Sequence, residues 1–399
     1  MSITDRVKPY MDELTAIRRD LHAHPELGFE ETRTAGIVAK KLREYGVDEV
    51  HTGIARTGVV GVVRGGGGRG GGSNRAVGLR ADMDALPIAE KNEFAHRSTQ
   101  AGKMHACGHD GHTTMLLGAA RYLADHRDEF DGTVYLFFQP AEEGKAGGRV
   151  MVEEGLFDRF PCEQVFGMHN MPGMPLGSIS MRPGPCMAAA DEFRITIRGR
   201  GGHGAMPHVS RDPVLIGAQI VTALQSIVSR RVDPIKDAVV SVTQFHAGDA
   251  FNVIPEEAVL CGTCRSFLPE VRDLIESELK RIATGVAAAF DASAEIAFMR
   301  NYPPTVNTLE ETEIAAAVAR QVVGAANVNT AADPKMGAED FSYMLEKRPG
   351  AYVWLGNGMP GEKGGAMVHT PQYDFNDDAI PYGVGFWAEL VRTVLPKAA

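Results

Sequence analysis

Cysteine is scarce in this chain of 399 residues, which holds five, a sparse set with an odd number of members. This scarcity excludes a disulfide scaffold, and we expect a reducing, cytoplasmic setting. Long apolar runs are also missing. No stretch of about 18 apolar residues is present to span a membrane, and the polar stretch after Met1 predicts no signal segment.

Positive charge is in deficit, because 41 Lys and Arg face 51 Asp and Glu, a formal net charge of −10. Proteins that follow a nucleic-acid backbone concentrate basic residues, and no basic block occurs here. We therefore expect a small molecule as partner, with no nucleic acid and no membrane. Apolar residues at 44% and charged residues at 23% are typical of a globular protein, and the length predicts more than one domain.

The two outer regions, 1–186 and 301–399, alternate helical periodicity with short apolar runs. Helices are expected at 5–22, 32–46, 111–126, 147–154, 312–323 and 377–395, and strands at 58–63, 76–79, 133–138, 164–168 and 351–355. This alternation favours an α/β domain with a mostly parallel sheet. A glycine-rich run at 65–73 lacks the ending of a phosphate loop, so we interpret it as a flexible hairpin connection.

The middle region, 187–300, has another pattern. Strands are expected at 192–198, 239–245, 258–267 and 295–299, and long helices at 213–231 and 269–290. The order β-α-β-β-α-β is the ferredoxin-like arrangement. The sequence therefore predicts a ferredoxin-like domain at 187–300, inserted into an α/β domain made of 1–186 and 301–399.

Polar side chains follow three of the expected strands at the points where the strands end. These side chains are Asp82, Asp84, Glu142, Glu143 and His169. Ligands of open α/β sheets bind at the carboxyl ends of strands, so we expect these groups at one edge. The segment 104–112, just before an expected helix, adds Cys107 and His109.

Cysteine, histidine and glutamate are ligands that Zn²⁺, Mn²⁺, Co²⁺ or Ni²⁺ accepts. The pair Glu142-Glu143 suits metal-assisted hydrolysis, because one carboxylate can hold a metal while the other moves a proton from water to the leaving amine. Each residue also has an ordinary interpretation: Cys107 as a core residue, Glu142-Glu143 as a solvated helix start, His169 as a hydrogen-bonded histidine. Their convergence favours the metal site.

Other motifs are weaker. Cys261 and Cys264 stand three apart on an expected strand and so face opposite sides, which indicates core cysteines rather than a zinc knuckle. The segment His22–Glu26 resembles a ligand cluster, but at a helix end capping and packing explain it at least as well. A Cys107/His109 nucleophile pair has unsuitable spacing, and no Gly-x-Ser-x-Gly elbow of a serine hydrolase is present.

With these motifs the chain resembles the aminoacylase/carboxypeptidase family of two-metal hydrolases, in its hippurate hydrolase and N-acyl-L-amino acid amidohydrolase branch. The resemblance covers nearly the whole chain. Its motifs lie, in order, at 20–27, 78–87, 104–112, 137–143, 167–170, 201–207, 252–255, 337–342 and 369–371.

The resemblance implies a role for each matching residue of the outer regions. Cys107 would bridge two divalent metal ions. The remaining ligands would be His109, Glu143, His169 and His369. Glu142 would act as general base and then as acid. Asp84 would lie beside the site and support a ligand or metal without being a ligand itself.

The resemblance also implies that the inserted domain is a lid and dimerisation domain. His203 would stabilise the oxyanion, often in the partner subunit's site, and Asn252 and Arg265 would hold the substrate's carboxylate. A homodimer is expected, with a tetramer left open.

The resemblance predicts a metal-dependent amidohydrolase that cleaves N-acetyl or N-benzoyl (hippurate-like) amino acids to a carboxylate and a free amino acid. A dipeptidase or aminopeptidase on the same scaffold is the first alternative, and a catalytically silent metal- or ligand-binding protein is the second. Many relatives carry His in place of Asp82 and Asp in place of Cys107, whereas the deacylase branch shares this chain's pattern. A bridging thiolate leaves Mn²⁺, Co²⁺ and Ni²⁺ as candidates beside Zn²⁺ and predicts sensitivity to oxidation.

Overall fold

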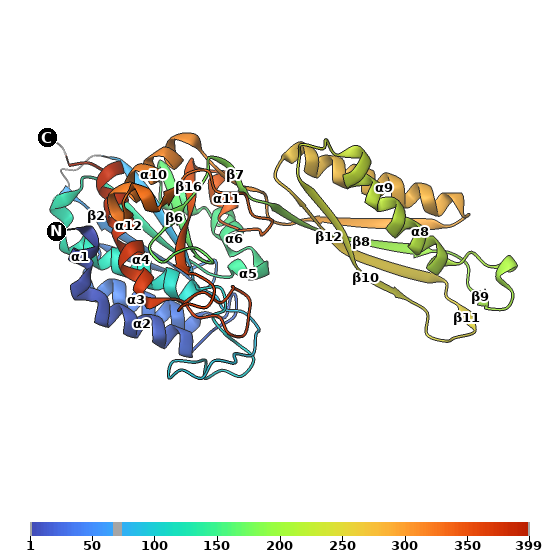
Figure 1. The fold of residues 1–399 in the computed structure, drawn as a ribbon, viewed down its shortest axis with the longest axis horizontal. Coiled ribbons are helices and arrows are strands. Elements are labelled where there is room, and N and C mark those ends of the chain that lie inside the picture. Colours follow the sequence, from blue (N-terminus) through green and yellow to red (C-terminus); the bar gives the residue numbers. More distant parts are fainter. Residues whose placement is uncertain (1, 67–73, 398–399) are drawn as a thin grey trace. The chain divides into compact units, whose positions relative to one another are not determined.

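The computed structural model describes residues 2–66 and 74–397, which form two compact units (Figure 1). The first unit comprises Met1–Gly184, Val306–Asp333 and Asp340–Ala399, and the second comprises Pro185–Thr305 and Pro334–Glu339. Most of the glycine-rich run, residues 67–73, lies outside the described residues. Among the described residues, no helix has the length and apolar character needed to cross a membrane.

The first unit is built on an eight-stranded sheet in the order β1-β2-β4-β3-β5-β16-β6-β15. The strands are β1 (Glu49–Ile54), β2 (Gly58–Arg64), β3 (Ala76–Asp82), β4 (Thr133–Gln139), β5 (Gln164–Pro172), β6 (Ile179–Ser180), β15 (Val328–Asn329) and β16 (Gly350–Gly358). The pairs β3–β4, β3–β5 and β5–β16 are parallel, which confirms the mostly parallel sheet at its centre. The carboxyl ends of β3, β4 and β5 therefore meet at one edge.

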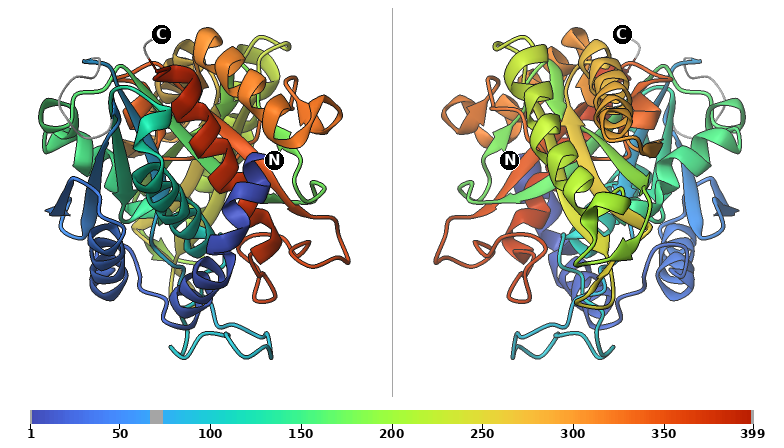
Figure 2. Two further views of the ribbon diagram at one scale, coloured as in Figure 1. Left: turned by 90° about the vertical axis from the view of Figure 1, so that its left-hand side faces the viewer. Right: turned by 90° about the vertical axis from the view of Figure 1, so that its right-hand side faces the viewer.

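Helices cover both faces of this sheet. They are α1 (Ile3–Val7), α2 (Met11–Ala23), α3 (Thr32–Glu44), α4 (His109–Asp125), α5 (Glu142–Lys145), α6 (Gly147–Glu153), α7 (Leu156–Arg159), α10 (Leu309–Val323), α11 (Ser342–Leu345) and α12 (Ile380–Val394). Helices α4 and α12 lie side by side against β3 (Figure 2), with α2 packed on α4. On β4, Leu136 and Phe138 join their core, while Phe137 meets Phe157 of α7 at 6.2 Å between ring centroids. Alternate side chains of β4 thus serve opposite faces.

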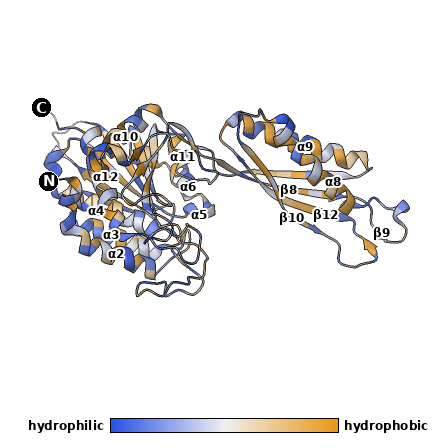
Figure 3. Ribbon diagram, viewed as in Figure 1, coloured by the Kyte–Doolittle hydropathy of each residue, from blue (hydrophilic) through white to orange (hydrophobic). Residues whose placement is uncertain are grey.

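The second unit has a four-stranded antiparallel sheet in the order β10-β12-β8-β13. Its main elements are β8 (Ala189–Arg198), α8 (Pro213–Ser226), β10 (Ala238–Ala247), β12 (Glu257–Ser266), α9 (Pro269–Ala289) and β13 (Ser293–Arg300). This order is the ferredoxin-like one that the sequence predicts. A π-helical turn, Ile227–Arg231, continues α8, and helices such as α9 mix hydrophilic with hydrophobic residues (Figure 3), as expected for helices with one packed face.

Short elements complete the chain. They are β7 (Gly184–Met187), β9 (Gly202–His203), β11 (Val253–Ile254) and β14 (Thr305–Asn307). Each of the five cysteines is a free thiol. Cys264 is buried in the core of the second unit, as predicted, but the assignment of Cys261 to a core is wrong. Cys261 points to the opposite face of β12, is half-buried and lies 3.7 Å from Arg194 Nη1.

Candidate active site

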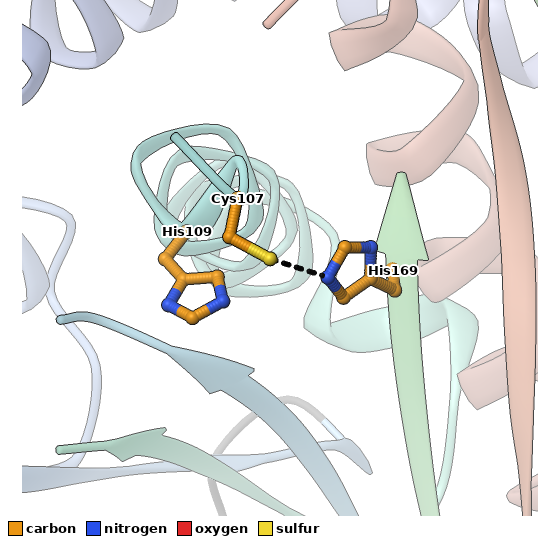
Figure 4. Close-up of side chains that lie close together, drawn as sticks. All are labelled: Cys107, His109 and His169. Atoms are coloured by element: carbon orange, nitrogen blue, oxygen red, sulfur yellow. Dashed lines mark hydrogen bonds between the residues drawn. The ribbon is translucent and has the colours of Figure 1, made fainter. Parts of the chain in front are cut away.

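The side chains expected to bind metal converge at the carboxyl edge of the large sheet. Ligand atoms of Cys107, His109 and His169 lie within 4.8 Å of one another, and those of Cys107, Glu143 and His369 form a second such group. Figure 4 shows Cys107 and His109 at the start of α4, facing His169 on β5. The sulfur of Cys107 is common to both groups, which is the geometry a bridging ligand requires.

A tight backbone turn places Cys107 and His109 on either side of Gly108. Gly108 has φ +99, in the left-handed region, and a Cβ there would lie 2.1 Å from Asn170 Oδ1 and 2.4 Å from Tyr373 Oη. Glycine alone tolerates both this conformation and this approach. The position therefore fixes how α4 begins and where its two candidate ligands point.

A strained segment presents the two glutamates after β4. Ala141 and Ala146 have φ of 56° and 54°, and Gly144 lies between them with φ 75°. Alanine rarely adopts this region, so the surrounding contacts must hold it there. The segment is not a solvated helix start, because Glu142 is only 7% exposed.

Asp84 supplies two of the hydrogen bonds that hold this segment. Its Oδ1 accepts from the backbone N–H of Glu142 at 3.0 Å, and its Oδ2 accepts from that of Glu143 at 2.9 Å. The Nδ1 of His109 lies 2.9 Å from the carbonyl oxygen of Asp84 and 3.3 Å from its Oδ1. A proton on Nδ1 satisfies both acceptors, which leaves the lone pair of His109 on Nε2 for a ligand.

His169 is oriented in a similar way. Its Nδ1 lies 2.5 Å from the carbonyl oxygen of Asn170 and donates to it, and its Nε2 lies 3.2 Å from Cys107 Sγ. Asn170 is held by its neighbours, with its Oδ1 2.7 Å from His112 Nε2 and its Nδ2 donating to Tyr373 Oη at 2.6 Å. The lone pair on His169 Nε2 therefore faces the shared cysteine.

Asp82 is engaged in hydrogen bonds on both of its carboxylate oxygens. Its Oδ1 lies 2.6 Å from His112 Nδ1, and its Oδ2 accepts from Arg80 Nη1 at 2.7 Å. Asp82 thus orients His112, which in turn contacts Asn170.

His369 reaches the site from the loop after β16. Its backbone has φ 62°, and its N–H donates to the carbonyl oxygen of Ala106 at 2.7 Å. Its Nε2 lies 3.2 Å from Glu143 Oε1. This backbone bond ties the His369 loop directly to the segment that carries Cys107.

The donor set fits divalent metal ions. His109 Nε2 is a buried atom without a hydrogen-bond partner, which in a native site calls for a ligand or an ion. Burial first, and then the charges of Glu143 and Glu142, raise the pKa of the Cys107 thiol well above its usual value. A thiolate in these surroundings requires a cation beside it.

The candidate residues of the second unit, His203, Asn252 and Arg265, lie at two separate locations. The strands β9 and β11 pair His203 with Val253, and Gly204 N–H donates to the carbonyl oxygen of Asn252 at 2.7 Å, so His203 and Asn252 are neighbours. The N–H of Ala205 donates to His203 Nδ1 at 3.1 Å, which leaves the proton of a neutral imidazole on the exposed Nε2.

Arg265 lies near the last residue of β12, in the four-stranded sheet, whereas Asn252 precedes the first residue of that strand. Arg265 follows Glu257, the first residue of β12, by eight residues, a distance of roughly 26 Å along an extended strand. Its Nη1 donates to the carbonyl oxygen of Cys264 at 2.8 Å and to Thr263 Oγ1. One copy of the second unit therefore does not bring Arg265 to His203 and Asn252.

Three residues that orient the candidate ligands were missed by the sequence analysis. His112 stands one helical turn after His109, and Asn170 follows His169, so both could have been suspected from spacing. Tyr373 offers no local signal, because its contact with Asn170 spans 203 positions of the chain.

Known proteins are similar to this chain in sequence and in fold. The model of peptidase family M20/M25/M40 matches residues 78–393. Hippurate hydrolase of Campylobacter jejuni is 41% identical over 395 residues, with 99% of this chain and 100% of that protein covered. N-acetylcysteine deacetylase of Bacillus subtilis is 38% identical over 388 residues, with 97% and 98% covered.

A solved structure is also similar to this chain in its three-dimensional fold. A dinuclear metal-binding peptidase of the M20 family from Bacillus subtilis superposes with a TM-score of 0.84 at 35% identity, covering 97% of this chain and 99% of that one. The match extends over both units, and the donor set described above is one that suits divalent metals. The chain belongs to peptidase family M20/M25/M40 and is a metal-dependent amidohydrolase.

Proposed function

We propose that the chain hydrolyses N-acyl amino acids to a carboxylic acid and an amino acid, with two divalent metal ions in its first unit. The observation that carries this proposal is the sharing of Cys107 between two groups of ligand atoms, with Glu142 beside them. The proposed metal ligands are Cys107, His109, Glu143, His169 and His369. Mn²⁺, Zn²⁺, Co²⁺ and Ni²⁺ all suit these donors.

Glu142 moves the proton in this reaction. Bound metal ions would polarise the amide carbonyl and activate water for attack. The Glu142 carboxylate, in one group with His109 and Glu143, takes a proton from the attacking water and delivers it to the leaving nitrogen. Attack of water forms the new C–O bond and a tetrahedral oxyanion, and the C–N bond breaks in a second step, when its nitrogen receives the proton from Glu142. Asp84 keeps Glu142 in place by accepting from its backbone N–H.

The substrate class follows from two relatives. Hippurate and N-acetylcysteine, which the names of these relatives give as substrates, are both N-acyl amino acids. Such a substrate carries a free carboxylate, for which the planar donors of Arg265, together with Asn252, are suited. We propose N-acetyl or N-benzoyl amino acids as substrates, with His203 donating from Nε2 to the developing oxyanion.

We propose a homodimer through the second unit, because a second copy can bring together the candidate residues that one copy keeps apart. His203 and Asn252 lie beyond the end of β12 at which that strand begins, and Arg265 lies near its other end. We propose that His203 and Asn252 of one chain act in the active site of the partner, together with the partner's own Arg265. Exposed apolar side chains support this contact, with Leu215 51% and Val253 54% exposed. Strand β10 is also an open edge of the sheet.

The experiment that tests the function is amino-acid release from a panel of N-acetyl amino acids, N-benzoyl amino acids and free-amine dipeptides. The protein is treated with a chelator and assayed before and after each divalent metal is added back. We expect metal-restored cleavage of N-acyl amino acids. Cleavage of dipeptides alone would place the chain with the peptidases, and no turnover with any metal would overturn the proposal.

The oxyanion role of His203 makes a distinct prediction. We expect His203→Ala to lower kcat by about 10²–10³-fold with little change in KM, because the lost donor acts on charge that develops only in the transition state. His208→Ala, a change of an exposed histidine on the same unit, serves as the control. A rise in KM with kcat unchanged would make His203 a residue of substrate binding instead.

A further inference from the structure

The segment His22–Glu26, which the proposed mechanism does not use, contains a fully buried histidine that lies between two carboxylates. His22 Nδ1 lies 2.8 Å from Asp110 Oδ2, and His22 Nε2 lies 3.1 Å from Glu90 Oε1. Burial disfavours its charge, but the hydrogen bonds with Asp110 and Glu90 raise the pKa of His22 to about 9. His22 is therefore neither a cap nor a metal ligand, but the centre of an ion pair between two carboxylates.

We propose that Arg18 and His22 of α2 are positioning residues for the metal centre, because they hold the two segments that carry Cys107, His109 and His369. This inference rests on the proposed function, since it takes these three residues as ligands. The evidence lies in two chains of contacts that begin on one face of α2 and end beside the ligands.

The first chain leads to the start of α4. Asp110 directly follows His109 and lies in the first turn of this helix. Its Oδ2 is paired with His22, whereas its Oδ1 has no hydrogen-bond partner, and Arg18 Nη1 is 3.7 Å from the carboxylate. Loss of His22 leaves this buried carboxylate poorly compensated, and we expect the start of α4 to shift in response.

The second chain leads to the His369 loop. Arg18 Nε donates to Asp377 Oδ1 at 2.6 Å, and Arg18 Nη1 donates to Asp374 Oδ1 at 2.9 Å. Asp374 is only five residues beyond His369, and the Arg18 side chain is fully buried. A two-pronged contact of this kind fixes both distance and direction, which a single point charge does not.

Glu90 connects His22 to the same loop. Its Oε1 accepts from Asn92 Nδ2 at 2.9 Å, and Asn92 Nδ2 also donates to the carbonyl oxygen of Tyr373 at 2.9 Å. The next backbone contact is from Lys91 N–H to the carbonyl oxygen of Pro371, again at 2.9 Å. His22 therefore contacts the start of α4 through Asp110. Through Glu90 it is also connected to the His369 loop, residues 359–376.

The test compares Co²⁺ binding by the full-length wild-type chain and by His22→Gln. Co²⁺ is followed by its thiolate charge-transfer and d–d absorption in competition with a chelator, so the measurement needs no turnover. We expect His22→Gln to bind Co²⁺ about 10–100-fold more weakly, with altered d–d bands, as for lost partners of metal ligands in other proteins.

Glu129→Gln is the matched control. Glu129 lies beyond the far end of α4 and pairs with Arg6 and with Tyr122 Oη, the latter at 3.1 Å. This variant also breaks an ion pair beside α4, but we expect wild-type Co²⁺ affinity and spectrum. A merely structural role of His22 predicts that both variants lower Tm and leave Co²⁺ binding alone.

The outcomes separate this inference from the function on which it rests. Absence of Co²⁺ binding in the wild-type chain overturns the proposed metal centre itself. Wild-type binding with an unchanged affinity and spectrum in His22→Gln overturns the positioning role alone. If His22→Gln does not fold, Arg18→Lys decides, because a lysine keeps the charge but cannot pair with both Asp374 and Asp377, and unchanged Co²⁺ binding there contradicts the inference.

Discussion

Glu142→Gln is expected to lower kcat by about 10³-fold and to leave the metal content unchanged. The carboxamide has nearly the same size as the carboxylate but cannot accept a proton from water, and general base and acid catalysis contributes about 10²–10⁴-fold. The Glu142 segment is held through the backbone N–H groups of Glu142 and Glu143 on Asp84, which the substitution preserves. The loss should therefore lie in the chemical step.

The measurement is kcat and KM on an N-acyl amino acid, with metal content determined on the same sample. Glu143→Gln is the matched control, because it makes the same change one residue later. We expect this control to weaken metal affinity, with activity that recovers in part at high metal concentration. Full turnover in Glu142→Gln, or loss of its metals, would refute the division of labour between the two glutamates.

Much of the fold could be predicted because its longer elements carry strong local patterns. Strand β2 is a continuous apolar run buried along nearly its whole length, and α9 keeps its apolar positions on one face over its full span. Strands of two residues, such as β6 and β9, have no periodicity to detect. Strand β6 forms on the edge of the longer β16, whereas β9 pairs with β11, another strand of two residues about 50 positions away. Neither pairing can be predicted from the local sequence.

In the candidate site too, residues with a local sequence signal could be predicted and those that depend on distant contacts could not. Glutamates and a histidine at strand ends predicted a site at one edge of a parallel sheet. In the structure, the ligand atoms of Cys107, Glu143 and His369 lie close together there. The parts that could not be predicted depend on contacts between distant segments. Arg18 meets Asp377 across 359 positions, and no spacing rule on one sequence relates the two.

Removal of Cys107, the ligand that both groups share, is expected to have the second large effect. We expect Cys107→Ala to lose both metal ions and to lower kcat/KM by at least about 10³-fold, the order supplied by several kcal/mol of transition-state stabilisation from the metals. The sulfur of Cys107 belongs to both groups of ligand atoms, so a single truncation opens both. Metal content by elemental analysis, beside kcat/KM with metals in excess, measures the two losses separately.

Two further variants show whether the loss comes from ligation or from packing. Cys162→Ala also removes a buried thiol of the first unit, and we expect it to lower stability while metal content stays at the wild-type value. Cys107→Asp offers a carboxylate, which bridges metals without a thiol, and we expect it to regain metals and part of the activity with a changed order of preferred ions. If Cys107→Ala retained two metals, or if Cys162→Ala lost them equally, Cys107 would not be the bridge, and the centre would need other ligands.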